Sequence, residues 1–309
     1  MSGDRHRILV VAAALVLACV VARLLSLLPG TTLLLVTVVA QSLTVGKLRR
    51  VLQIFFPFAL FGAAYGWLGL LGPHVVSRGV HVAGPYLLDK ELFGLGEGAW
   101  RVTLNELFAR YHGKVLDVVT GLAYASFLYV VLGAAVFLAL ADRSAAGARR
   151  VRHFGWCFLA LNVAGFATYA AFPAAPPWYV SLHGLGPVDP AATPNPAALA
   201  RVDALFGVPY FATFYAHSQE VFGSMPSMHC AYPLLMWLFV RELGRPWASR
   251  AALLFWLVTC FAAVYLQHHY VIDGIAGAGY ALLIYGANRW ARRSSRIADD
   301  VPLGATAPA

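Results

Sequence analysis

Long apolar runs separated by short polar segments dominate the sequence. A helix of about 20 apolar residues crosses the hydrocarbon core of a bilayer, and shorter helices suffice when their neighbours cover them. The pattern therefore predicts an all-α fold, a polytopic membrane helical bundle of about eight transmembrane helices. The predicted spans are residues 8–28, 31–45, 51–71, 115–140, 154–172, 228–240, 251–266 and 271–287.

Two longer segments interrupt this pattern. In residues 72–114 charged and apolar positions alternate, and Leu104, Leu107 and Phe108 have the i, i+3, i+4 spacing of a helix face. This helical segment either lies at the membrane interface or packs on the bundle as an ordinary helical loop. Residues 174–225 are rich in Pro and Gly and are predicted to form a loop, and a loop of this length in a compact bundle is usually functional.

The composition agrees with a membrane protein. Hydrophobic residues make up 60% of the chain and charged residues only 12%, whereas a soluble domain carries about 25% charged residues. The four cysteines lie in apolar runs without the spacing of a metal site, so we expect them to be small buried hydrophobic residues.

The net charge of +9 is explained by topology and requires no nucleic acid partner. With eight spans both termini lie on one side, and every short loop on that side is basic, so the positive-inside rule makes it cytoplasmic. We therefore expect a multi-pass protein of the cell membrane. The 16 of 23 Lys and Arg on that side are Arg5, Arg7, Lys47, Arg49, Arg50, Arg143, Arg149, Arg150, Arg152, Arg241, Arg245, Arg250, Arg289, Arg292, Arg293 and Arg296.

The candidate chemistry falls at the opposite, extracytoplasmic face. In GSMPSMHCAYP, residues 223–233, Pro226 and Ser227 signal the start of a helix, whose free N–H groups suit a phosphate. His229 stands one turn into this helix. In QHHYVID, residues 267–273, His269 and Asp273 are separated by one helical turn.

These side chains suit phosphoryl transfer. His269, as a neutral imidazole, can attack phosphorus, and Asp273 can hold its other ring nitrogen and stabilise the cation that forms. His229 can protonate the leaving oxygen as a general acid. Ser224 and Ser227, at the start of the same helix, can hold the non-bridging phosphate oxygens.

Other interpretations stay open. Each short motif recurs by chance, and only their order and shared face favour catalysis. A proton-coupled transporter would also use buried His and Asp, although transporter sites lie near the bilayer midplane. A zinc site from His229, His268, His269 and Asp273 has plausible ligands, but the spacing does not require a metal.

The two motifs resemble those of the type 2 phosphatidic acid phosphatase superfamily. That superfamily has PS-x-H, here Pro226–His229, followed by H-x-x-x-D, here His269–Asp273. The segments FPAAPPWY, residues 172–179, and LDKELFG, residues 88–94, are similar to the branch that includes inositol phosphorylceramide synthase. The resemblance implies that His269 is the nucleophile, Asp273 its partner and His229 the general acid, with no metal or other cofactor.

The sequence also departs from the superfamily pattern. The first motif, a Lys followed by Arg-Pro, is absent, and Ala262 and Ala263 replace the Ser-Arg that usually precedes the nucleophilic His. Two basic phosphate ligands are therefore missing, and Arg201 in the outer loop is our candidate substitute. His268 is a further candidate for substrate binding, although on a helix its side chain would point away from His269.

Pro177, Trp178 and Tyr179 either anchor the chain at the membrane interface or form the wall of a headgroup pocket.

Together these features predict N-terminal transmembrane helices over residues 1–84, a catalytic membrane core over 85–290, and a basic, then disordered cytoplasmic tail over 291–309. The predicted function is a lipid phosphotransferase that acts through a phosphohistidine and moves a phosphoryl group or a phospho-headgroup from a phospholipid to a lipid or alcohol acceptor. A phosphatase of lipid or polyprenyl phosphates, with water as acceptor, is the alternative. The sequence does not determine the donor lipid, the acceptor or the oligomeric state.

Overall fold

The computed structural model describes residues 14–21, 29–68, 79–216, 218 and 221–300. Within these ranges the regular secondary structure is helical and no strand occurs, so the predicted all-α class is confirmed. The long helices are α2 (Pro29–Leu43), α3 (Gly46–Leu68), α7 (Lys114–Ala141), α8 (Ala145–Ala171), α12 (Met228–Val240), α13 (Pro246–Tyr265) and α14 (Val271–Asp300).

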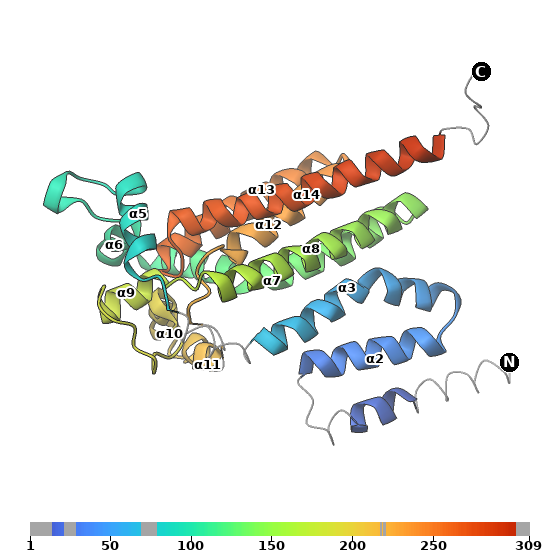
Figure 1. Cartoon of the computed structure of the whole chain (residues 1–309), viewed down its shortest axis with the longest axis horizontal. Coiled ribbons are helices and arrows are strands. Elements are labelled where there is room, and N and C mark those ends of the chain that lie inside the picture. Colours follow the sequence, from blue (N-terminus) through green and yellow to red (C-terminus); the bar gives the residue numbers. More distant parts are fainter. Residues whose placement is uncertain (1–13, 22–28, 69–78, 217, 219–220, 301–309) are drawn as a thin grey trace.

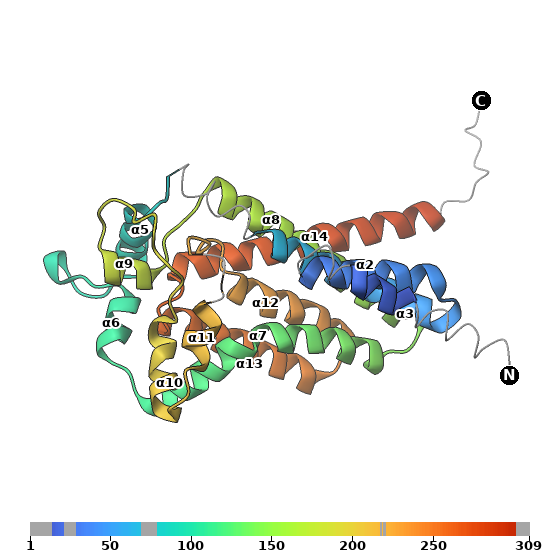
Figure 2. The same ribbon diagram turned by 90° about the horizontal axis from the view of Figure 1, so that it is seen from below.

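The long helices run alongside one another, and the short helices of residues 83–110 and 177–216 gather at one end of the bundle (Figure 1). Helix α12 lies between α8 and α14 on one side and α7 and α13 on the other (Figure 2). It is apolar all round, as a helix enclosed by others must be, and Leu235 and Phe239 are buried completely. Helix α3 packs on α8, where Phe58 contacts the rings of Phe154 and Phe158.

Where the structure describes the predicted spans, they overlap with helices, although the helix ends differ by a few residues or more. Among the described residues three helices, α7, α8 and α13, are long and apolar enough to cross a membrane, which supports a multi-pass membrane protein. Helix α12 has 13 residues and is therefore about 20 Å long, shorter than the hydrocarbon core. The first predicted span, 8–28, lies largely outside the described residues, and the total of eight spans stays a prediction.

Helices α8 and α14 extend furthest beyond the limits predicted from hydrophobicity. Helix α8 begins at Ala145, because Ser144 caps it and accepts the N–H of Gly147. Helix α14 continues from the predicted end at residue 287 to Asp300. In the polar extension of α14, Arg292 pairs with Glu242 at 2.9 Å. Hydrophobic runs do not predict these polar turns, which remain helical. Residues 301–309 of the predicted tail lie outside the described ranges.

The region predicted as one long loop, residues 174–225, contains several short helices. These are α9 (Pro177–His183), η3 (Ala197–Leu199), α10 (Ala200–Phe206) and α11 (Tyr210–Ala216). Pro177 stands at the first position of α9, where a missing N–H costs nothing. The Asp203 carboxylate accepts the N–H groups of Phe211 and Ala212 at the start of α11.

The segment 81–110 forms a helical hairpin at the same end of the bundle, with α5 (Ala83–Phe93), η2 (Gly98–Trp100) and α6 (Leu104–Arg110). The predicted helix over Leu104–Phe108 is present and starts with a capping box between Thr103 and Glu106. Phe108 packs on Phe261 and Tyr265 of α13, as the packed alternative predicts.

Candidate functional site

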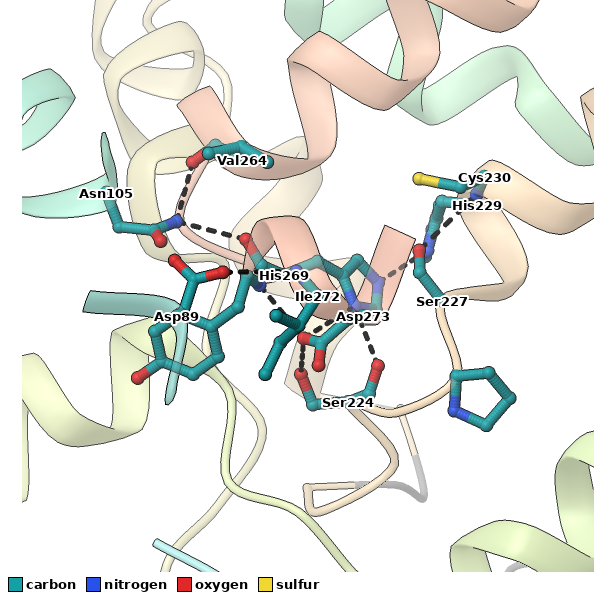
Figure 3. Close-up of polar contacts among 12 residues, drawn as sticks. Asp89, Asn105, Ser224, Ser227, His229, Cys230, Val264, His269, Ile272 and Asp273 are labelled. Atoms are coloured by element: carbon teal, nitrogen blue, oxygen red, sulfur yellow. Dashed lines mark hydrogen bonds and ion pairs between the residues drawn. The ribbon is translucent and has the colours of Figure 1, made fainter. Parts of the chain in front are cut away.

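The two histidine motifs meet where α12 and α14 begin (Figure 3). Ser227 caps α12 by accepting the N–H of Cys230 at 3.3 Å, which places His229 in the first turn. The backbone N–H of Ser227 donates to the carbonyl oxygen of Asp273 at 2.9 Å. The cap of one helix thus bonds to the first turn of the other, and the motifs are held together by backbone contacts.

His269 lies in the turn between α13 and α14, two residues before α14 begins. The turn is tight, because the N–H groups of His268 and His269 both donate to the carbonyl oxygen of Ala263, at 3.1 and 3.0 Å. Gln267 adopts a φ of 69°, a conformation that non-glycine residues rarely adopt. This turn aims the His269 side chain back at α12.

The ring nitrogens of His269 have different surroundings. Nδ1 lies 2.9 Å from the carbonyl oxygen of Ser224, and Nε2 lies 3.1 Å from Nδ1 of His229. Because a carbonyl oxygen can only accept, the proton sits on Nδ1 and the lone pair on Nε2. The free lone pair of His269 therefore faces His229.

Asp273 stands behind His269 and is completely buried. Its Oδ2 lies 3.6 Å from Nδ1 of His269, a distance for electrostatic attraction rather than a hydrogen bond. The same oxygen accepts the Ser224 hydroxyl at 2.6 Å and the N–H of Tyr270 at 2.9 Å. Ser224 therefore touches both partners, with its carbonyl on His269 and its hydroxyl on Asp273.

His229 and His269 line a cavity of about 400 Å³, a volume typical of a small-ligand site. Its walls are mainly apolar and aromatic, and no Lys or Arg occurs among the described residues that line it. Tyr124 stacks on His229 with 3.9 Å between ring centroids, and its hydroxyl lies 3.2 Å from Nδ1 of that histidine. Sequence reasoning missed Tyr124, because one more aromatic residue in an apolar helix carries no signal.

Comparison with known proteins agrees with this geometry. The model of the PAP2 superfamily matches residues 97–287, which include both histidine motifs. The chain belongs to the PAP2 superfamily.

Membership of the PAP2 superfamily confirms the expected class of enzyme, a lipid phosphotransferase or phosphatase. The chain is 34% identical to the phosphoinositol dihydroceramide synthase of Bacteroides thetaiotaomicron, over 76% of this chain and 75% of that protein. It is 35% identical to the inositol phosphorylceramide synthase of Candida albicans, over 59% of this chain and 38% of that protein. These relatives confirm the resemblance to the synthase-like branch, and no solved structure matches the chain significantly.

His268, next to the PAP2 histidine His269, also lines the cavity. The expectation that its side chain points away from His269 assumed a helix, whereas the two residues lie in a turn. The ring of His268 stacks on the rings of Tyr124 and Tyr215, with ring centroids 4.9 and 5.0 Å apart. Its Nε2 is 3.2 Å from the carbonyl oxygen of Pro196. Burial and the nearby His269 lower the pKa of His268 to about 3, so this side chain is neutral.

Arg201, our candidate for the missing basic ligand of the PAP2 pattern, is not among the residues that line the cavity. Its guanidinium binds Oδ1 of Asp117 through Nε at 2.9 Å and a terminal nitrogen at 2.8 Å. Tyr265 donates its hydroxyl to the same oxygen at 2.8 Å. Arg201 thus joins α10 to α7, and the hypothesis that it holds the phosphate lacks structural support.

The remaining candidates divide between the cavity and its surroundings. Trp178 lines the cavity, and its backbone N–H donates to the carbonyl oxygen of Gln267 at 3.0 Å. Tyr179 lies outside the lining and accepts the N–H of Asp189 at 2.8 Å. Pro177 starts α9 and Ser227 caps α12, so both shape the backbone around the cavity without lining it. Among the described residues, no three His, Cys, Asp or Glu side chains are arranged to bind a metal ion.

Proposed function

We propose that this PAP2 superfamily member transfers a phosphoinositol headgroup from a phospholipid to the hydroxyl group of a ceramide-like lipid, through a phosphohistidine on His269. Its relatives, a phosphoinositol dihydroceramide synthase and an inositol phosphorylceramide synthase, suggest the headgroup and the acceptor class. The contact between Nε2 of His269 and Nδ1 of His229, 3.1 Å apart on the wall of an apolar cavity, supports the mechanism.

In the first step the lone pair of His269 Nε2 forms a bond to phosphorus, and the bond from phosphorus to the lipid oxygen breaks. His229 donates its proton to that oxygen, and a lipid alcohol leaves. The carbonyl of Ser224 holds the proton on His269 Nδ1, and the Asp273 carboxylate stabilises the positive charge that develops on the ring. Substrate binding separates the two imidazole rings so that the phosphoryl group fits between them.

The second step reverses the roles. The acceptor hydroxyl gives its proton to His229, its oxygen forms a bond to phosphorus, and the nitrogen–phosphorus bond breaks. The electron pair of that bond returns to His269. Since leaving and entering oxygens both meet His229, one acid–base residue serves both half-reactions.

The shortage of positive charge around the cavity favours a phosphodiester over a phosphomonoester. A phosphomonoester carries about −1.5 to −2 charges at neutral pH, because its second pKa is about 6. A phosphodiester carries a single negative charge and therefore needs less compensating positive charge from the protein. The described lining offers histidines but no Lys or Arg, so headgroup transfer fits it better than the removal of phosphate.

The proposed function also assigns the active site to one side of the membrane. The site lies at the end of the bundle that carries most of the short helices, whereas the cluster of Arg150, Arg292 and Glu242 joins α8, α14 and the 3-10 turn η4 (Arg241–Leu243) that follows α12. The positive-inside rule assigns the arginine-rich loops to the cytoplasm. We therefore place the active site at the outer leaflet of the cell membrane.

The test is a product analysis with purified protein in mixed micelles. With phosphatidylinositol and ceramide, we expect one phosphoinositol-ceramide for each donor consumed, and no product from His269→Ala. Release of inorganic phosphate from a lipid phosphomonoester, without headgroup transfer, would instead make the protein a phosphatase. Proton movement across vesicles without lipid conversion would make it a transporter.

A further inference from the structure

The helical hairpin over residues 81–110 directs two buried polar side chains at the turn that carries His269 (Figure 3). Asp89 belongs to α5 and is completely buried, and Asn105 belongs to α6 and is 2% exposed. Neither side chain lines the cavity. Buried polar groups are costly unless they are bonded, so their contacts indicate what they do.

The Asn105 amide closes the turn. Its Nδ2 donates to the carbonyl oxygens of Val264, at 2.9 Å, and of His269, at 3.0 Å. In return, Gln267 donates its side-chain amide to the backbone carbonyl of Asn105 at 2.7 Å. One amide therefore bridges the last turn of α13 and the backbone of His269, across the residue with the unusual φ.

Asp89 acts on the other side of His269. The first N–H groups of a helix lack partners within the helix. The backbone N–H of Ile272, in the first turn of α14, donates to Oδ1 of Asp89 at 3.0 Å. Asp273 accepts the N–H of Tyr270 at 2.9 Å. Two carboxylates thus divide the open N–H groups at the start of α14, which leaves Asp273 in contact with Tyr270, Ser224 and His269.

We propose that Asp89 and Asn105 are positioning residues, which hold the backbone on both sides of His269 so that its Nε2 faces His229. This inference rests on the proposed function, in which His269 is the nucleophile. The hairpin makes no contact with the reacting atoms and acts only through the turn. A small rotation of this turn would move the nucleophile out of line with phosphorus, and losses of this kind reduce kcat more than substrate affinity.

The experiment compares kcat and KM for headgroup transfer among matched variants. Asp89→Leu removes the acceptor, Asp89→Asn keeps an oxygen acceptor, and Asn105→Leu removes the amide. We expect Asp89→Leu and Asn105→Leu each to lower kcat at least 10-fold with KM within twofold of the wild type. Asp89→Asn should stay within threefold, and Glu91→Leu, an exposed position of the same helix, should match the wild type.

Full kcat in Asp89→Leu and Asn105→Leu would overturn the inference, and so would an equal loss in Asp89→Asn and Asp89→Leu. If Asp89→Leu does not fold, Asn105→Leu decides alone by the same criterion. His269→Ala separates the two proposals. Retained transfer in that variant contradicts the proposed function, whereas its loss beside unimpaired hairpin variants contradicts only the positioning role.

Discussion

Nε2 of His269 lies 3.1 Å from Nδ1 of His229, although 40 positions separate the two residues in the sequence. The contact joins the first turn of α12 to the turn before α14. It brings the proposed nucleophile and the proposed proton donor to one face of the same cavity, as a two-step displacement at phosphorus requires.

Replacement of His229 tests its role as a general acid. In His229→Ala we expect kcat for the lipid donor to fall about 100-fold or more, since the leaving alkoxide is no longer protonated. A phosphodiester with a nitrophenol leaving group needs no such proton, so in the first turnover, before an acceptor reacts, the same variant should release nitrophenol within about 10-fold of the wild-type rate. Equal losses on both substrates would assign His229 a binding role instead.

Arg201 is expected to serve stability and not phosphate binding. Arg201→Met leaves the buried Asp117 carboxylate without its cation, which costs about 3 kcal/mol or more of unfolding free energy. For Arg201→Met we predict a lowered melting temperature and, below that temperature, a kcat within threefold of the wild type. The double variant Arg201→Met, Asp117→Leu should recover stability. A loss of kcat at an unchanged melting temperature would instead support a phosphate-binding role for Arg201.

Asp89 should make stability depend on pH. Burial, together with the charge of Asp273, raises the pKa of Asp89 from 3.8 to about 6. Because the folded state holds this proton more tightly than the unfolded state, the contribution is present below pH 3.8 and is lost as the pH rises through about 6. Between about pH 4 and 7 the melting temperature of Asp89→Asn should therefore rise by about 5 °C relative to the wild type. A difference that is independent of pH would show that Asp89 does not titrate in this range.

Periodicity and motif spacing predicted the helical bundle and the residues of the two motifs. They could not predict the contacts that orient His269, because these come from backbone groups. The Ser224 carbonyl binds Nδ1, and the Ala263 carbonyl shapes the turn. Any residue type can supply a carbonyl oxygen, so the sequence holds no signal for either contact.

The contacts of Asp89, Asn105 and Arg201 join residues that are far apart in the sequence, so the sequence did not predict them. Asp89 lies 183 positions from Ile272 and Asn105 lies 164 positions from His269, so the sequence pattern of residues 72–114 predicts a helical segment but not these two contacts. Arg201 matches a missing basic ligand by its charge and its place in the outer loop, but no sequence pattern indicates that Asp117, on another helix, binds it. Pairings of this kind depend on how the helices pack, which hydrophobic patterns do not specify.

The most direct test is to trap the phosphorylated enzyme. Donor labelled in its phosphodiester is mixed with protein without acceptor, quenched in base and mapped by mass spectrometry. We predict a base-stable, acid-labile label on His269, absent from His269→Ala and discharged when ceramide is added. Label on another residue, or headgroup transfer in a protein that never carries label, would contradict the account.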